Sequence, residues 1–470
     1  MPPLTSEMRR GGIIAAALLL GACADEPFGT VVPPELDAAG VLVNEHNVLS
    51  AIVSVRARHA DNVMVRYRLF DAAGDAASET PAVPVTGETA MIPVLGLLPD
   101  SRYVMRPLVS GAGGTVTGDA LEFTTGALPS DLPSYVASGP DPSPGYVLFA
   151  AGDYVLVIDN TGRVVWYRHF VNGAGLNFMA QPTGRYVLRP PAPDPAAVAP
   201  WVELDPLGNI TRTLSCALGL RPRLHDILLE EDGSYWIMCD ETHTMDLTAF
   251  AGVAAAQVTG TVVQHLGAEE AVLFQWSPFD HFEITDLDPA ALTGANVNWT
   301  HGNAIDIDGD GNLIVSFRSL DEITKIDGRT GAVIWRMGGR RNEFTFLDTP
   351  SPAFAHQHSA RAYAKGGLLL LDNLGDPAES RAEHYVVDDA SRTARLAHSY
   401  GSIPAAVTQL GGSVQDLGGG RTLVSFGTAG RVEEYDAAGR VTWRIEGNPG
   451  YVFRAERIRS LYAPGVGTAR

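Results

Sequence analysis

Side chains capable of acid–base or nucleophilic chemistry recur in the second half of the sequence, beside strongly apolar segments. The segments are RLHDILL, WTHGNAIDI, IVSFRSL and FAHQHSARA. The residues that they supply are His225, Asp226, His301, Asn303, Arg318, His356 and His358. A single such histidine is more often a hydrogen-bonded structural residue. Four of the chain's 12 histidines at equivalent positions beside an arginine indicate a shared site.

Three kinds of chemistry fit this set of side chains. Three imidazoles can bind zinc or iron, although the fixed charge of an arginine would repel a metal cation. Arginine and histidine donors match the oxygens of a tetrahedral anion. A neutral imidazole can also attack an electrophile while its neighbours hold the transferred oxygens.

The elements that must position these residues repeat along the chain. Each repeat has a strand, an acidic turn with glycine, and a second strand that often ends in tryptophan, as in VIDNTGRVVWYR. The repeats are residues 157–168, 203–214, 266–276, 325–337, 386–396 and 434–445. Their spacing of roughly 46 to 63 residues is typical of four-stranded blades with insertions.

An all-β fold ending in a six-bladed β-propeller over residues 139–470 is therefore predicted, with the candidate residues directed toward one axis. A solenoid of β-meanders is the alternative. A closed propeller is favoured over an open solenoid because the last repeat is as apolar as the first and has no polar cap. The last repeat runs into YVFRAERIRSLY.

Residues 30–127 alternate apolar and polar side chains with period two, as half-buried strands do. This region resembles an immunoglobulin-like or fibronectin type III sandwich, with Tyr103 as its tyrosine corner. Residues 128–138 form the expected linker. Since the region contains no cluster of reactive groups, we expect it to act as a spacer or to form a homodimer.

The N-terminus is typical of an exported protein. Residues 1–22 contain two arginines and a short apolar run, which is too short to remain as a membrane anchor. The small residues before Cys23 resemble a bacterial lipobox, and Ala24 fits the outer-membrane sorting pattern. We expect a protein tethered by lipid on Cys23 in the cell envelope, at the periplasm or outer membrane. An ordinary secretory signal is the alternative.

Two further cysteines, Cys216 and Cys239, are 23 residues apart at the ends of expected strands. In an oxidising compartment they can form a disulfide. Two buried free thiols are the alternative, because cysteine is also a common core residue.

The composition excludes several classes of function. A net charge of −20 repels phosphate backbones, so nucleic acid is not an expected partner. The sequence has no Walker loop, no H-E-x-x-H and no G-x-S-x-G. The stretch DIDGDGN (306–312) lacks the glutamate of a calcium loop, because the twelfth position is Phe317; it is predicted to be a turn between strands.

The order of these motifs resembles the bacterial arylsulfotransferase (aryl-sulfate sulfotransferase) family over roughly residues 140–465. The matching segments are LHDILLEEDG, NWTHGNAIDIDGDGNLIVSFRSLDEITKID, TGAVIWRMGG, FAHQHSAR, LLLLDNLGD and FRAERIRSLY. The resemblance implies a propeller that moves a sulfuryl group from a phenolic sulfate ester to a phenol. It further implies that neither phosphoadenylyl sulfate nor a metal is needed, and that His358 is the nucleophile.

In the reaction that the resemblance implies, Arg318 holds the sulfuryl oxygens together with His301 and Asn303. His225 or His301 exchanges the proton of the phenol. His356 is a neighbour of the nucleophile and a candidate for substrate binding. The expected small-molecule partners are aryl sulfates and phenols, and a sulfatase that uses water as acceptor would need the same residues.

Two other functions remain open from the sequence. One is a non-catalytic cell-surface propeller that binds anionic or aromatic ligands or another protein. The other is a metal-dependent or quinone-dependent oxidoreductase, which is disfavoured because the histidines lack a metal-ligand spacing. Convergence of His225, His301, Arg318 and His358 within a few ångströms would favour the transferase.

Overall fold

The described part of the protein consists of β-strands, short 3-10 helices and loops. A computed structural model describes residues 31–71, 77–194, 197–349, 353–363, 367–375 and 378–464. The expected signal peptide (1–22) and lipidation site (Cys23) lie outside these residues. No helix in the described ranges is long and apolar enough to cross a membrane.

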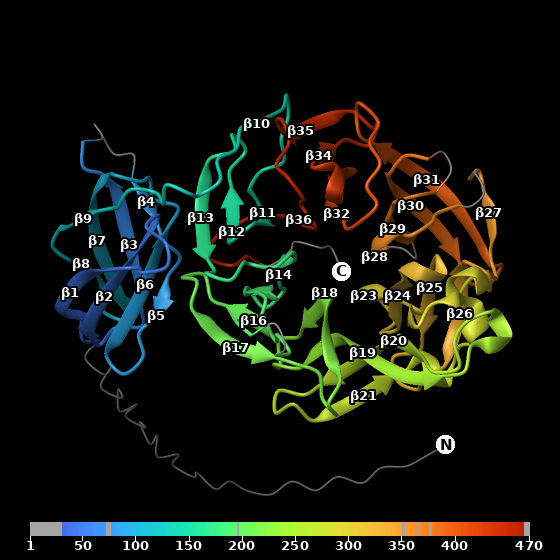
Figure 1. Ribbon diagram of the computed structural model, residues 1–470. Coiled ribbons are helices and arrows are strands. Elements are labelled where there is room, and N and C mark those ends of the chain that lie inside the picture. The colour runs from blue at the N-terminus through green and yellow to red at the C-terminus, as the bar shows by residue number, and fades with distance from the viewer. Residues whose placement is uncertain are drawn as a thin grey trace, which may run out of the picture.

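The N-terminal strands form two sheets within the described residues, beside a larger ring of sheets (Figure 1). One sheet contains β1 (Glu35–Val43), β2 (Ser50–Arg58) and β6 (Thr89–Leu95). The other contains β3 (Asn62–Leu69), β4 (Ser78–Glu79), β5 (Val83–Pro84), β7 (Arg102–Gly111), β8 (Gly114–Thr117) and β9 (Leu121–Thr124). Alternate side chains of β2, β3, β6 and β7 form one apolar core. The Tyr103 hydroxyl accepts a hydrogen bond from the Leu98 amide (2.8 Å), as a tyrosine corner does.

The rest of the described chain forms six sheets that lie around a common centre (Figure 1), numbered here 1 to 6 in chain order. Sheet 1 contains β36 (Ala455–Ile458), β11 (Tyr146–Ala151), β12 (Tyr154–Ile158) and β13 (Val164–His169). Sheet 2 contains β14 (Phe178–Ala180), β15 (Tyr186–Leu188), β16 (Trp201–Leu204) and β17 (Ile210–Leu214). Sheet 3 contains β18 (Arg221–Leu229), β19 (Tyr235–Met245), β20 (Ala256–Leu266), β21 (Val272–Trp276) and β22 (Asn296–Asn298).

Sheets 4 to 6 follow the same plan. Sheet 4 contains β23 (Gly302–Ile307), β24 (Leu313–Phe317), β25 (Glu322–Ile326) and β26 (Val333–Gly338). Sheet 5 contains β28 (His358–Tyr363), β29 (Gly367–Asp372), β30 (Arg381–Asp388), β31 (Thr393–Gly401) and β27 (Thr345–Leu347). Sheet 6 contains β32 (Ser413–Gly418), β33 (Arg421–Ser425), β34 (Val432–Tyr435), β35 (Val441–Ile445) and β10 (Ala137–Ser138). Short 3-10 helices lie in the loops: η1 (Thr248–Phe250), η2 (Pro278–Asp280), η3 (Ile284–Asp286), η4 (Pro289–Thr293), η5 (Arg318–Leu320) and η6 (Gly427–Ala429).

The sequence repeats coincide with the outer hairpin of each ring sheet, for example β12–β13 and β34–β35. In the first of them, Asp159 accepts hydrogen bonds from two backbone amides of its own turn, and Gly162 has a φ of 93°. The tryptophan that follows ties neighbouring sheets together. Trp166 donates to the Pro206 carbonyl of sheet 2, and Trp443 donates to the Asn160 carbonyl of sheet 1. Two of the repeats therefore link neighbouring sheets through the same kind of tryptophan hydrogen bond.

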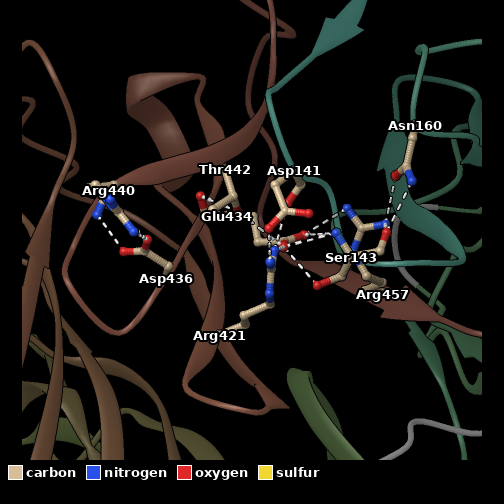
Figure 2. Close-up of polar contacts among 9 residues, drawn as sticks. All are labelled: Asp141, Ser143, Asn160, Arg421, Glu434, Asp436, Arg440, Thr442 and Arg457. Atoms are coloured by element: carbon tan, nitrogen blue, oxygen red, sulfur yellow. Dashed lines mark hydrogen bonds and ion pairs between the residues drawn. The ribbon is translucent and has the colours of Figure 1, made fainter.

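The strand β36 joins the far end of the described chain to sheet 1, because it pairs antiparallel with β11. Around this join, Glu434 of β34 is completely buried and contacts Arg457 (3.0 Å) and Arg421 (3.0 Å). Ser143 donates to the same carboxylate (2.7 Å), and Arg457 also donates to Asn160 (2.8 Å). Figure 2 shows these contacts, which we call the closure cluster.

The N-terminal sheets contact the outer strands of sheets 1 and 2. Asn44 donates to the Leu207 carbonyl (2.9 Å), and the Val48 amide donates to the Tyr167 hydroxyl (3.3 Å). Leu49 is buried in the same apolar cluster as sheet 1. This contact surface lies on the outer rim of the ring, away from its centre (Figure 1). Of the expected linker, Ala137–Ser138 belong to sheet 6 as β10.

The Cys216 and Cys239 sulfurs are 2.01 Å apart, as in a disulfide. The bond closes a loop with a sequence separation of 23 residues, which contains β18 of sheet 3. Replacing both cysteines by alanine is expected to lower the free energy of unfolding by about 3 kcal/mol. The measurement is urea unfolding with and without dithiothreitol. An unreactive pair of thiols and no effect of the reductant would contradict the bond.

Candidate functional site

The structure brings the three predicted histidines His225, His301 and His358 together near the centre of the ring. The His225 ring centroid is 5.1 Å from that of His301 and 6.4 Å from that of His358. They come from β18, the residue before β23, and β28, which are the inner strands of sheets 3, 4 and 5. Phe453, just before β36, packs 5.8 Å from His225 and 6.3 Å from His358. We call the rings of His225, His301 and His358 the histidine cluster.

A break in strand register occurs at each of these inner strands. The pairing of β18 with β19 shifts between Pro222 and Ile227. The pairing of β23 with β24 shifts between Gly302 and Ala304, and that of β28 with β29 shifts between His358 and Arg361. Such bulges redirect side chains and are frequent beside active sites. The bulges free the reactive side chains from the alternation of a regular strand.

Backbone strain accompanies the bulges. His301 and His356 have φ angles of 48° and 53°, and Ser359 has a φ of 57°. Residues other than glycine rarely adopt this left-handed region, and each such residue costs roughly 1–3 kcal/mol unless its surroundings hold it. The concentration of strained residues around the histidine cluster therefore marks it as a candidate active site.

His358 is held so that one ring nitrogen is available. Its Nδ1 lies 2.8 Å from Oδ1 of Asn373 and 3.1 Å from the His356 carbonyl, and both partners accept hydrogen bonds. The Asn373 amide donates to the Thr408 and Gly411 carbonyls (3.0 Å each), which fixes its Oδ1 toward the histidine. Nδ1 must therefore carry the proton, and Nε2 keeps its lone pair.

The positioning role of Asn373 leads to a prediction. Asn373→Ala removes the acceptor that fixes the tautomer and orientation of His358, so kcat with an aryl sulfate is expected to fall by about 10²-fold with little change in KM. Steady-state kinetics measure both constants, and circular dichroism checks the fold. An unchanged kcat would show that Asn373 does not position the nucleophile.

All three clustered histidines are neutral at pH 7. Burial lowers the pKa of His358 to about 4 and that of His301 to about 3, and it lowers the pKa of His225 well below its usual value. The charge of Arg318 adds to the lowering at His301 and His358. Neutral imidazoles are the form that attacks an electrophile or accepts a proton.

These pKa values predict the pH dependence of activity. The value of kcat/KM for 4-nitrophenyl sulfate should stay level from about pH 8 to about pH 5 and fall as His358 is protonated through its pKa of about 4. The unfolded state binds these protons already near pH 6.5, so stability also declines as the pH falls below that value. Circular dichroism at each pH separates the two effects. An acid limb near pH 6.5 in the folded protein would contradict the prediction.

The hydrogen bonding of the ring nitrogens differs between His301 and His225. Asn298 lies 2.6 Å from Nδ1 of His301 and can donate to it, so the neutral ring carries its proton on Nε2. Nδ1 of His225 is buried and has no hydrogen-bond partner in the described part of the chain. His301 is therefore a hydrogen-bond donor, whereas His225 has an unpaired nitrogen.

Arg318 and Asn303 lie beside the cluster. The Arg318 amide donates to the His301 carbonyl (3.0 Å), and its side chain donates to the Gln409 carbonyl (3.2 Å). Asn303 donates one amide hydrogen to the Gln357 carbonyl (2.7 Å). The Arg318 Nε and the Asn303 Oδ1 are buried without a partner among the described residues. Buried groups of this kind normally have partners, so their concentration here indicates a site for a polar ligand or water.

The His356 ring makes its contacts outside the histidine cluster. Its Nδ1 pairs with Asp321 (3.1 Å), and this hydrogen bond raises the pKa of the imidazole. The His356 carbonyl, rather than its ring, contacts His358. The structure therefore gives His356 a supporting position and leaves its ring engaged with Asp321.

A layer of buried charge lies next to the histidine cluster. Asp226 is fully buried and pairs with Arg361 (2.8 Å) and Arg454 (3.4 Å). Arg454 also donates to Asn177 (2.9 Å) and to the His225 carbonyl (3.3 Å). This layer separates the histidines from a cavity of about 940 Å³, which lies toward the other ends of the inner strands. The cavity therefore does not contain the reactive groups.

Two residues that contact the histidines of the cluster, Asn373 and Arg454, were not among the site residues predicted from the sequence. Asn373 ends the segment LLLLDN and could have been chosen as a polar residue directly after a buried strand. Arg454 could not have been assigned, because its partner Asp226 is 228 residues away. No group of three or more His, Cys, Asp or Glu side chains in the described ranges is arranged to hold a metal ion.

Several solved structures resemble the chain. A protein of unknown function from Bacteroides caccae is 14% identical, covering 68% of this chain and 100% of its own, with a TM-score of 0.44. A streptogramin B lyase is 11% identical, covering 66% and 87%, with a TM-score of 0.38. A virginiamycin B lyase from Staphylococcus aureus is 10% identical, covering 68% and 89%, with a TM-score of 0.37. A comparison with curated proteins gives no match.

A family model matches the part of the chain that carries the site. The match extends over residues 222–448, which include the whole histidine cluster, Arg318 and Asn373. The family is described as arylsulfotransferase (ASST). Residues 222–448, which carry the candidate site, are thus similar in sequence to the arylsulfotransferase family.

Proposed function

We propose that the protein transfers a sulfuryl group from an aryl sulfate to a phenol through a sulfohistidine at His358. The observation that carries the proposal is the state of His358: it is buried and neutral, and its Nδ1 is engaged by Asn373. The positive charge of Arg318 also acts on His358 and helps to keep its ring neutral. The match of residues 222–448 to the arylsulfotransferase family supports the same reaction.

The reaction balances in two half-steps. Nε2 of His358 attacks the sulfur of the aryl sulfate, the nitrogen–sulfur bond forms, and the sulfur–oxygen bond breaks with its electron pair going to the phenolate. The oxygen of a second phenol then attacks the same sulfur, its proton leaves, and the electron pair of the nitrogen–sulfur bond returns to Nε2. The scheme is ping-pong and, like phosphoryl transfer, depends on positioning and charge stabilisation.

The neighbouring residues would bind the sulfuryl oxygens and exchange the proton of the phenol. Arg318 and the second amide hydrogen of Asn303 would hold the sulfuryl oxygens. His301, with its proton on Nε2, would donate a hydrogen bond to the phenolate oxygen. His225, with an unpaired nitrogen, would accept the proton of the incoming phenol. Phosphoadenylyl sulfate and metal ions have no role in this scheme.

We further propose that the ring of sheets is a six-bladed β-propeller and that the N-terminal sheets form an immunoglobulin-like sandwich. The pairing of β36 with β11 and the Tyr103 hydrogen bond support these assignments. Export and lipid attachment at Cys23 place the enzyme in the bacterial cell envelope, and the sandwich is the candidate surface for a homodimer. The fatty acid on Cys23 is detectable by mass spectrometry of the purified membrane form.

The test is a transfer assay with 4-nitrophenyl sulfate as donor and phenol as acceptor. Release of 4-nitrophenol, formation of phenyl sulfate, and a protein adduct of roughly 80 mass units after an alkaline quench are expected. Release with inorganic sulfate as the only product would identify a sulfatase. If several aryl sulfates gave neither release nor adduct, a ligand-binding propeller would replace the enzyme.

A further inference from the structure

A second, smaller cavity adjoins the histidine cluster on the side of sheet 3. Its volume is about 250 Å³, and His225 is one of its walls. Pockets for drug-sized ligands usually measure about 300–1,000 Å³, so this one suits a single substituted ring. The cavity lies within the bulge of β18, where residues between Pro222 and Ile227 leave the regular pairing with β19. It is therefore part of the same local distortion that positions His225.

The walls of this cavity are strongly cationic. Arg189, Arg221 and Arg223 line it, and Asp240 is the only acidic residue among its wall residues in the described chain. Three arginines and one aspartate give a net charge of +2, in a chain whose net charge is −20. Positive charge in a concave site attracts anions.

One of these arginines has an unused donor. The Arg223 side chain is 8% exposed, and its Nη1 donates to Asp240. Its Nε is buried and has no partner among the described residues. Leaving a buried donor unpaired is unfavourable, so a ligand or water acceptor is expected there. Nδ1 of His225 is unpaired in the same cavity wall.

The cavity is close enough to the reactive groups to hold another part of the same substrate. Arg223 and His225 are two residues apart on β18, and the charge of Arg223 lowers the pKa of both His225 and His301. His225 is in turn 6.4 Å from His358 between ring centroids. His225 therefore belongs both to the wall of this cavity and to the histidine cluster, so the two adjoin.

We infer that this cavity binds a carboxylate on the aromatic ring of the substrate, with Arg223 as the main contact. This inference rests on the proposed sulfuryl transfer. The planar guanidinium matches a carboxylate better than a single point charge does. Because the scheme is ping-pong, donor and acceptor rings occupy the same place in turn, so both the phenyl sulfate and the phenol are carboxylated.

The test compares two acceptors of the same shape, 4-hydroxybenzoate and its neutral amide, 4-hydroxybenzamide. Isothermal titration calorimetry with the full chain should show about tenfold tighter binding of the carboxylate. In Arg223→Gln the two affinities should become equal, while binding of the amide stays unchanged. Arg221→Gln, at an exposed position of the same wall, should reduce the preference less, and Arg163→Gln in sheet 1 is the control for total charge. Circular dichroism verifies the fold of each variant.

Binding and turnover separate the two hypotheses. Equal affinities for both acceptors in the unmodified protein, or a carboxylate preference that survives Arg223→Gln, would overturn the carboxylate site. Sulfation of 4-hydroxybenzamide from 4-nitrophenyl sulfate tests the transferase by itself. A carboxylate preference in binding without any sulfation would retain the cavity assignment and reject the reaction.

Discussion

Replacing His358 by alanine is expected to abolish transfer, with kcat at least about 10⁴-fold lower and no protein adduct. The reason is that His358, buried and neutral, has its proton fixed on Nδ1 by Asn373 and therefore keeps its lone pair on Nε2. The measurement is release of 4-nitrophenol together with the intact mass of the protein. Added imidazole should restore part of the release from the alanine variant.

The matched control is His356→Asn, two residues earlier. Its ring is engaged by Asp321, and asparagine tolerates the left-handed backbone at this position. Activity should fall by no more than about tenfold, since the contact to His358 comes from the backbone carbonyl. If His358→Ala kept more than a tenth of the activity, the nucleophile would have to be another residue.

Glu434→Gln is expected to destabilise the protein by about 3–5 kcal/mol, because it leaves the buried charge of Arg457 without its counter-ion. Glu434 is 0% exposed and Arg457 is 3% exposed. The control lies at the turn of the same hairpin, β34–β35, where Arg440 pairs with Asp436 but is 81% exposed (Figure 2). Arg440→Gln should change stability by less than about 0.5 kcal/mol.

Urea unfolding followed by tryptophan fluorescence measures both changes as shifts of the midpoint. The double replacement Glu434→Leu with Arg457→Met removes both charges and should recover much of the loss. Equal midpoints for Glu434→Gln and Arg440→Gln would show that the closure cluster does not stabilise the ring.

The repeated part of the fold was predictable because the signal is local. Each outer hairpin has an acidic residue in its turn region, and most also have a glycine and a tryptophan within about a dozen residues, so the repeats fall on β12–β13 through β34–β35. The pairing of β36 with β11 and of β10 with β35 involves residues that are far apart in sequence. No local pattern encodes the identity of such partners.

The sequence allowed us to predict which histidines gather at the candidate site, but not which contacts each of them makes. Period-two alternation would place His356 and His358 on the same face of a strand. The left-handed backbone at His356 breaks that alternation, so one ring joins the cluster and the other pairs with Asp321. The choice between a disulfide and free thiols at Cys216 and Cys239 was also open, because spacing alone does not bring two strands together.

The join at β36 has a consequence for biosynthesis. Ser143 and Arg457, which meet in the closure cluster, are 314 residues apart, so a chain that crosses a membrane N-terminus first cannot make this contact until Arg457 has followed. Arg454, which donates a hydrogen bond to the His225 carbonyl, lies just before Arg457 in the chain and crosses at the same stage. Delivery from the N-terminus therefore brings in the three histidines one sheet at a time and completes their support last. If the chain is exported as proposed, a chain halted before β36 has crossed would lack that support, and the proposed sulfuryl transfer would begin only after translocation is complete.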